Sequence, residues 1–134
     1  MKIQHVELTY VNQTWPLVEG YISSALEHGQ DDYTVEQVKV FVTTGQWTLI
    51  VATEDGQIKG AAVVNFFNRP NHRVAFVVCI GGKLISNEDT FKQFQTILVM
   101  FGATYIEGAA RESIARLWTR YGFTEKYRIV GVQI

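Results

Sequence analysis

Apolar residues in the last third of the chain recur with the spacing of a helix. The positions i, i+3, i+4 and i+7 are Ile114, Leu117, Trp118 and Tyr121. This spacing is typical of a helix that buries one face. Gly122 follows at once, where a helix commonly ends on a left-handed residue, and Phe123 can then return to the core. The pattern predicts a helix over residues 111–122.

Three further helices are expected earlier in the chain. Residues 14–29 are predicted to form one, with Thr14 as its cap and Pro16 in its first turn. Residues 34–45 begin with the capping box Thr34–Gln37 and end at Gly45, which favours a helix, although their β-branched residues leave a strand as the alternative. The third helix covers 86–102, with Ser86 as the cap and Asp89 in the box position. Residues 30–33 form a polar link.

Strands are predicted between these helices, over 2–10, 47–53, 58–67, 73–80, 104–109 and 125–134. Asp55-Gly56 is a tight hairpin turn. Residues 73–80 are almost continuously apolar, as expected for a strand covered on both faces. The element order β, α, α, β, β, β, α, β, α, β predicts a single α/β domain over residues 1–134, with a mixed central sheet of about six strands and four flanking helices.

Composition excludes several classes of function. The formal net charge is −1 and no basic run occurs, so general binding to nucleic acid is not expected. No window approaches the roughly 20 apolar residues of a membrane span. The single cysteine, Cys79, allows neither an internal disulfide nor a zinc site of the usual kind, so no metal is expected. These observations favour a cytoplasmic protein.

The order of elements and the ending Leu117 to Phe123 resemble the GCN5-related N-acetyltransferases. The final helix of that family commonly reads Asn-x-x-Ala-x-x-Leu-Tyr-x-x-x-Gly-Phe. Leu117, Gly122 and Phe123 match this motif, and Arg111 stands at the Asn position. Trp118 stands where the tyrosine often serves as general acid. Tyr121 is three residues further on, about 300° round the helix, and could approach the site only if the helix is rotated or shifted. The alternative is that it is a core or boundary aromatic.

The resemblance implies acetyl-CoA as a substrate and an amine, small or on a protein, as the acceptor. The family motif Arg/Gln-x-x-Gly-x-Gly/Ala holds the coenzyme pyrophosphate, and here Gly82, Ile85 and Asn87 stand at its key positions, so the loop is degraded. A displaced phosphate loop at Gly81-Gly82-Lys83 is one interpretation, and a plain exit turn is the other. The predicted coenzyme-binding residues are Cys79, Ile80, Gly81, Gly82, Lys83, Asn87 and Arg111.

Glu107 is the best candidate for a general base, and the alternative is an exposed charge at a strand end. Glu107 and Tyr121 are therefore the predicted catalytic pair. Two functions remain open: an acetyl-CoA-dependent N-acyltransferase, and a non-catalytic binding or assembly module of the same fold. Small divergent proteins of this fold occur in phages, and the chain resembles that type, which would place it in the host cytoplasm or in a virion. A homodimer or a protein-assembly partner is compatible with the apolar strands.

Overall fold

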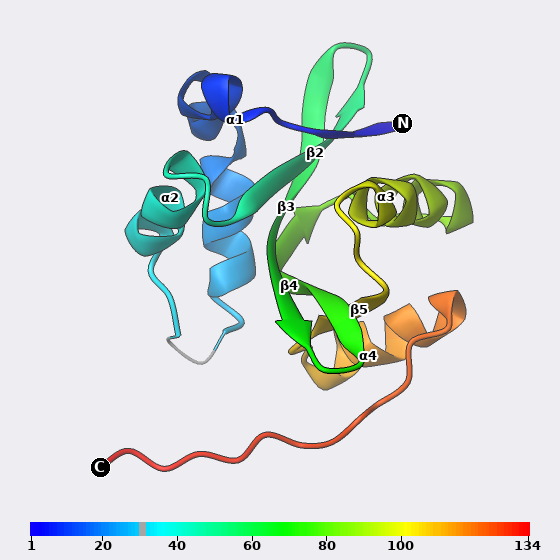
Figure 1. The fold of residues 1–134 in the computed structure, drawn as a ribbon. Coiled ribbons are helices and arrows are strands. Elements are labelled where there is room, and N and C mark those ends of the chain that lie inside the picture. Colours follow the sequence, from blue (N-terminus) through cyan, green and yellow to red (C-terminus); the bar gives the residue numbers. More distant parts are fainter. Residues whose placement is uncertain (30–31) are drawn as a thin grey trace.

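The structure, a computed structural model, describes residues 1–29 and 32–134, so the first half of the expected link over 30–33 lies outside the described residues. Five strands form one mixed sheet in the order β1-β2-β3-β4-β5 (Figure 1). The pairs β1–β2, β2–β3 and β3–β4 are antiparallel, and the pair β4–β5 is parallel. The strands are β1 (Lys2–His5), β2 (Thr48–Glu54), β3 (Gln57–Arg69), β4 (His72–Gly82) and β5 (Tyr105–Gly108).

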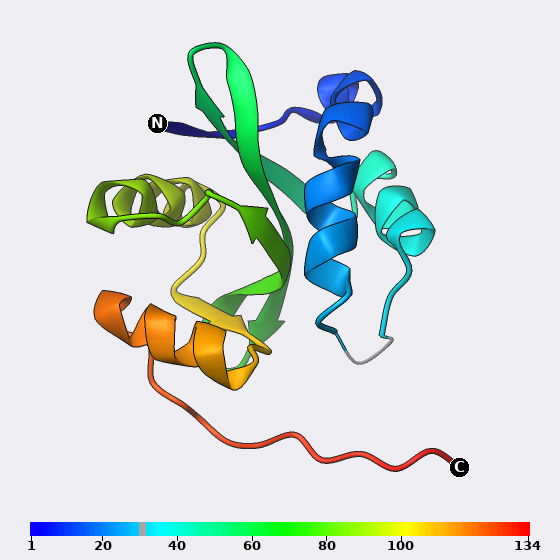
Figure 2. The same cartoon turned by 180° about the vertical axis from the view of Figure 1, so that it is seen from behind.

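Helices cover both faces of the sheet (Figures 1 and 2). They are α1 (Leu8–Leu26), α2 (Val35–Thr43), α3 (Glu88–Met100) and α4 (Glu112–Trp118), and α4 continues as one 3-10 turn over Thr119–Tyr121. α1 and α2 lie on one face, and α3 and α4 lie on the other. No described helix is both long enough and apolar enough to cross a membrane.

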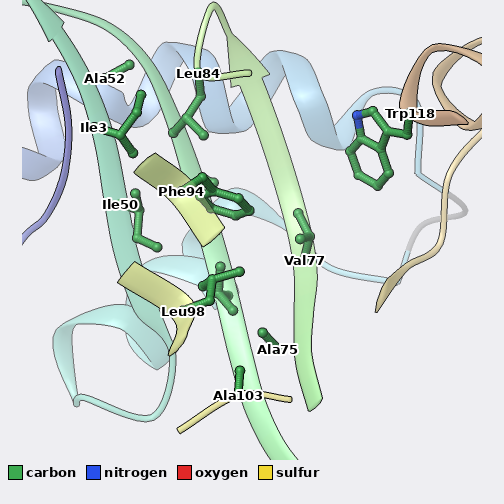
Figure 3. Close-up of a cluster of buried hydrophobic side chains, with 12 residues drawn as sticks. Ile3, Ile50, Ala52, Ala75, Val77, Leu84, Phe94, Leu98, Ala103 and Trp118 are labelled. Atoms are coloured by element: carbon green, nitrogen blue, oxygen red, sulfur yellow. The ribbon is translucent and has the colours of Figure 1, made fainter. Parts of the chain in front are cut away.

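Alternate residues of the central strands build two separate cores. On β3, Ala61 and Val63 join the core under α1 and α2, whereas Ala62 and Val64 join the core under α3 and α4. Successive strand residues point to opposite faces, so a strand between two helical layers must be apolar on both. Figure 3 shows the second core, in which Phe94 and Leu98 of α3 pack over the sheet. The predicted α/β fold class is confirmed.

Several local predictions are confirmed in their geometry. Asp55 and Gly56 have φ angles of 53° and 76°, as a tight hairpin turn requires. Thr34 accepts a hydrogen bond from the amide of Gln37, and the Gln37 side chain accepts one from the amide of Thr34, which completes the capping box of α2. Gly122 ends the last helical segment with φ 92°.

The expected start of the first helix is wrong. α1 begins at Leu8 instead of Thr14, so Pro16 lies inside the helix and the first strand ends at His5. An interior proline costs about 3 kcal/mol. Four apolar side chains on one helix face are almost fully buried and offset this cost: Val11, Trp15, Val18 and Ile22.

The cap of α3 lies one residue later than predicted. Asn87 is the cap, and its side chain accepts a hydrogen bond from the amide of Thr90 at 2.9 Å. The Thr90 hydroxyl occupies the box position expected for Asp89 and accepts from the amides of Ser86 and Asn87. Thr90 is completely buried, so the hydroxyl can make these bonds away from water.

The sixth strand predicted over 125–134 is also wrong, and the sheet has five strands rather than about six. The described chain after Gly122 has no regular secondary structure. Figures 1 and 2 show it running away from the body of the molecule. β5 is only four residues long, so it offers a short edge on which a further strand could form.

Candidate functional site at the parting of β4 and β5

The two parallel strands of the sheet separate halfway along β4. β4 and β5 are paired from Val74–Tyr105 to Val77–Gly108, after which β5 ends and β4 continues to Gly82. Residues 78–82 therefore have β3 on one side and no paired strand on the side of β5. We call this edge of residues 78–82 the open edge of β4. An unpaired strand edge presents backbone amides and carbonyls that can bind another extended chain.

A β-bulge lies at the point where the strands part. Val64 pairs with Val77 and Val63 pairs with Cys79, so Val78 is an extra residue on β4. A bulge bends its strand and increases the local twist. The bend moves the end of β4 away from the line of β5 and so supports the separation of the two strands.

Gly81 and Gly82 are required by the packing of the end of β4. A methyl group at Gly81 would lie 2.5 Å from the carbonyl oxygen of Tyr21 in α1, and one at Gly82 would lie 2.4 Å from that of Lys59 in β3. Gly82 also has φ 70°. The amide of Lys83 donates to the carbonyl of Lys59 at 2.9 Å. Close packing thus accounts for both glycines without a phosphate, while the exposed Lys83 side chain stays available to an anion.

Three backbone amides around the start of α3 are occupied by the capping box. Ser86 and Asn87 donate to the Thr90 hydroxyl, and Thr90 donates to the Asn87 side chain. A phosphate cradle needs such amides free to point at the ligand. Glu88 and Asp89 add two carboxylates to the first turn. These two carboxylates repel an anion at this helix start.

The Trp118 side chain fills the space beside Gly108, where β5 ends. The side chain is 7% exposed, and a methyl group at Gly108 would lie 3.2 Å from its Cζ3 atom. Figure 3 shows the indole on the flank of β4 beside Val77. Phe123 packs on the indole, with ring centroids 5.1 Å apart. The position that carries the tyrosine in the motif is therefore occupied by a packed apolar ring.

Tyr121 and Arg111 lie at opposite ends of the last helical segment. Tyr121 is half-buried and stacks on Phe91 in the first turns of α3, with centroids 4.9 Å apart. Arg111 immediately precedes α4, and its Nη1 atom lies 3.4 Å from Nδ1 of His28, beyond the end of α1. The described contacts thus bring Tyr121 to the α3 side of the site, but they do not bring Arg111 to Lys83 or Asn87.

Glu107 of β5 pairs with Phe76 of β4, one residue before the final pair of these two strands, Val77 with Gly108. Its carboxylate accepts two hydrogen bonds from the Arg69 guanidinium, at 2.6 and 2.7 Å, and one from Lys126 Nζ at 3.1 Å. The Glu107 side chain is 12% exposed. The hydrogen bonds from Arg69, followed by those from Lys126, lower the pKa of Glu107 below its ordinary value. A carboxylate held in this way is a weak base.

Replacing Glu107 by glutamine is expected to lower the free energy of unfolding at pH 7 by about 2 kcal/mol, the loss typical of hydrogen bonds to a charged group. Because the folded-state pKa is lowered, the stabilisation is complete above the ordinary value of 4.5 and is lost as pH falls through the folded-state pKa. Urea unfolding at pH 7, 5 and 3 measures the difference between the two proteins.

Glu125→Gln is the matched control for this substitution, because Glu125 pairs with Arg128 in full contact with solvent. Its effect should stay below about 0.5 kcal/mol. Equal losses for the two variants would contradict a stabilising role of the Arg69–Glu107 pair.

Cys79 lies on the open edge of β4 but is not a nucleophile. Burial raises the pKa of its thiol to about 12, so the thiolate is essentially absent at neutral pH. Among the described residues, no three side chains of the metal-binding types cluster.

Two surface hollows lie away from the parting of β4 and β5. One of about 500 Å³ lies along the exposed side of α3, where Lys92 and Val99 line it. The other, of about 190 Å³, lies between β1, α1 and β2 and includes His5 and Leu49. The open edge of β4 is thus a strand edge and not one of these hollows.

Sequence comparison finds no protein-family model and no curated protein that matches the chain. Solved structures do match. A probable acetyltransferase superposes with a TM-score of 0.70 at 13% identity, covering 100% of this chain and 98% of its own.

Two further neighbours have named activities. The aminoglycoside N-acetyltransferase AAC(6')-Iy in complex with CoA gives a TM-score of 0.69 at 14% identity, with 99% and 93% of the two chains covered. A ribosomal-protein-alanine N-acetyltransferase from Brucella melitensis gives 0.63 at 12% identity, with both chains covered in full. Agreement over whole chains at such low identity establishes a shared architecture. The chain has the fold of the GCN5-related N-acetyltransferases.

Proposed function

We propose that this protein binds an acyl-CoA along the open edge of β4 and transfers the acyl group to an amine. The observation that carries the proposal is the parting of the parallel strands after Val77 and Gly108. The pantetheine arm of coenzyme A is an extended chain with amide groups, and it can hydrogen-bond to a strand edge as a further strand does. AAC(6')-Iy, which has the same fold, was solved with CoA.

In the proposed reaction the amine nitrogen attacks the thioester carbonyl carbon. The new carbon–nitrogen bond forms, the nitrogen gives up one proton to water, the carbon–sulfur bond breaks, and the coenzyme leaves as its thiolate. Backbone amides near Cys79 to Gly81 are the groups available to stabilise the developing oxyanion. Tyr121 is the phenol assigned to return a proton to the thiolate, and this role requires the ring to leave its stack on Phe91.

The electrostatics of Glu107 favour certain acceptors. A base paired with Arg69 and Lys126 removes a proton from an ammonium group poorly. The proposal therefore favours amines that are already neutral to a useful extent near pH 8, such as the α-amino group of a polypeptide, over lysine side chains. Since acyl-CoA is an intracellular metabolite, the site of action proposed is the cytoplasm, or a host's cytoplasm if the chain is phage-encoded.

A second candidate function is a non-catalytic binding or assembly module. The capping-box hydrogen bonds that occupy amides at the start of α3 favour it, and so do the acidic residues Glu88 and Asp89. The buried indole of Trp118, which fills the space where β5 ends, favours it too. This candidate predicts that acyl-CoA does not bind, which distinguishes it from the first.

Isothermal titration with acetyl-CoA at low salt tests the proposal, and micromolar binding is expected. Lys83→Ala should weaken binding about three- to tenfold, because a partly solvated ion pair contributes about 1 kcal/mol. Lys39→Ala is the matched control: it removes the same charge from an exposed position on α2 and should change nothing. Millimolar or weaker binding by the unaltered protein would contradict the enzyme proposal and support the non-catalytic module.

A further inference from the structure

The indole of Trp118 closes the point at which the two parallel strands part. Val77 of β4 and Gly108 of β5 are the last residues paired there. A methyl group on Gly108 would lie 3.2 Å from Cζ3 of the indole, closer than the roughly 3.5–4.0 Å at which two carbon atoms pack best. Trp118 and Val77 belong to the same buried cluster, as Figure 3 shows. A group that came down the open edge of β4 to this point would therefore meet the ring.

The indole is held on more than one side. The Phe123 ring packs on it with centroids 5.1 Å apart, and Phe123 in turn makes an edge contact with Phe91 of α3 at 5.8 Å. The amide of Phe123 also donates to the carbonyl of Trp118 at 3.3 Å. Side chains in such close-packed surroundings yield little, because any shift must displace their neighbours too. The ring is consequently a fixed boundary rather than a movable lid.

The open edge of β4 gives an extended ligand a direction. In the proposed complex the anionic end of acyl-CoA would lie beside the exposed Lys83 side chain, and the pantetheine arm would follow residues 82–78. The residue steps from 83 to 78 cover about 17 Å of strand, a distance that the extended arm can span. The thioester would then lie near the amides proposed to stabilise its oxyanion, and the acyl chain beyond it would point at Val77 and Gly108. The acyl chain is thus the part of the ligand that reaches Trp118.

We infer that Trp118 sets the length of the acyl group that the protein accepts. An acetyl group ends before the ring, whereas a chain as long as hexanoyl must displace a buried aromatic side chain or leave its apolar tail in water. The indole at the tyrosine position of the motif thus selects the substrate by shape, a role that needs no proton. This inference rests on the proposed function, because it requires acyl-CoA to bind along the open edge of β4.

Isothermal titration with CoA, acetyl-CoA and hexanoyl-CoA tests the inference. The unaltered protein should bind hexanoyl-CoA at least about tenfold more weakly than acetyl-CoA. Trp118→Leu removes the ring and leaves an apolar cavity, and such cavities bind apolar groups. This variant should prefer hexanoyl-CoA by at least about fourfold, which is the gain for burying one methylene group. CoA carries no acyl group and should bind to both proteins alike.

Trp118→Phe provides a second variant, because it keeps an aromatic ring in the core and removes less of the boundary. Its relative affinity for hexanoyl-CoA should fall between those of the unaltered protein and Trp118→Leu. Leu117→Ala is the matched control. Leu117 precedes Trp118 on the same helix and is 37% exposed, so this variant should keep the preference for acetyl-CoA.

The CoA titration separates failure of this inference from failure of the proposed function. If CoA binds but the unaltered protein takes both acyl-CoA probes equally well, the inference is overturned and the proposed function stands. The same holds if both Trp118 variants keep the preference for acetyl-CoA. If neither CoA nor acetyl-CoA binds to the unaltered protein, the proposed function fails and the inference fails with it.

Discussion

Replacement of Gly82 by alanine is expected to lower the free energy of unfolding by about 3 kcal/mol or more, by combining strain at positive φ with a backbone collision. The added methyl group would lie 2.4 Å from the carbonyl oxygen of Lys59 and 2.8 Å from the Cα of Gly60. Neither backbone atom can move without disturbing β3. Chemical denaturation measures the loss.

Gly56→Ala separates the two contributions. Gly56 has φ 76°, close to the 70° of Gly82, but no atom lies within 4 Å of the position of its added methyl group. This variant should lose only about 1 kcal/mol, the cost of the left-handed backbone. If Gly82→Ala is no more destabilising than Gly56→Ala, the glycine is not required by packing, and a ligand-binding role becomes the better explanation for it.

Replacement of Trp118 by alanine is expected to cost about 3–5 kcal/mol, as is usual for a large buried aromatic. The ring fills the space over Gly108 and packs against Phe123, so its loss leaves a cavity where β5 ends. Thermal and urea unfolding of the variant measure the cost.

Leu117→Ala is the matched control, since Leu117 precedes Trp118 on the same helix and is 37% exposed. Its cost should be about 1 kcal/mol or less. Similar costs for the two variants would contradict the placement of Trp118 in the core. Trp118→Tyr retains most of the apolar ring and puts a phenol at this position, so it should be more stable than Trp118→Ala.

Local patterns predicted the architecture well because each depends on a few neighbouring residues. Only local backbone geometry is involved in the hairpin turn at Asp55-Gly56, in the capping box at Thr34 and in the end of the last helical segment at Gly122. The start of α1 could not be predicted in the same way. Burial of Trp15 and Ile22 against the sheet outweighs the proline in the helix, and that burial is a tertiary effect.

The candidate site was harder to predict for the same reason. The sequence singled out Glu107 and Gly82, but it could not reveal that Arg69 binds the Glu107 carboxylate or that Lys59 lies against Gly82. Arg69 is 38 residues away along the chain from Glu107. The bulge at Val78 also has no marker in a run of apolar residues, because it is defined only by pairing with β3.

The parting of β4 and β5 is the feature on which the proposed function depends. The most direct measurement follows the backbone amide signals of isotope-labelled protein during the acetyl-CoA titration. The largest shifts are expected at residues 78–81 and at Gly108, where the strands separate. Shifts confined to Lys83 and the start of α3, or no shifts at millimolar acetyl-CoA, would contradict binding along the open edge of β4.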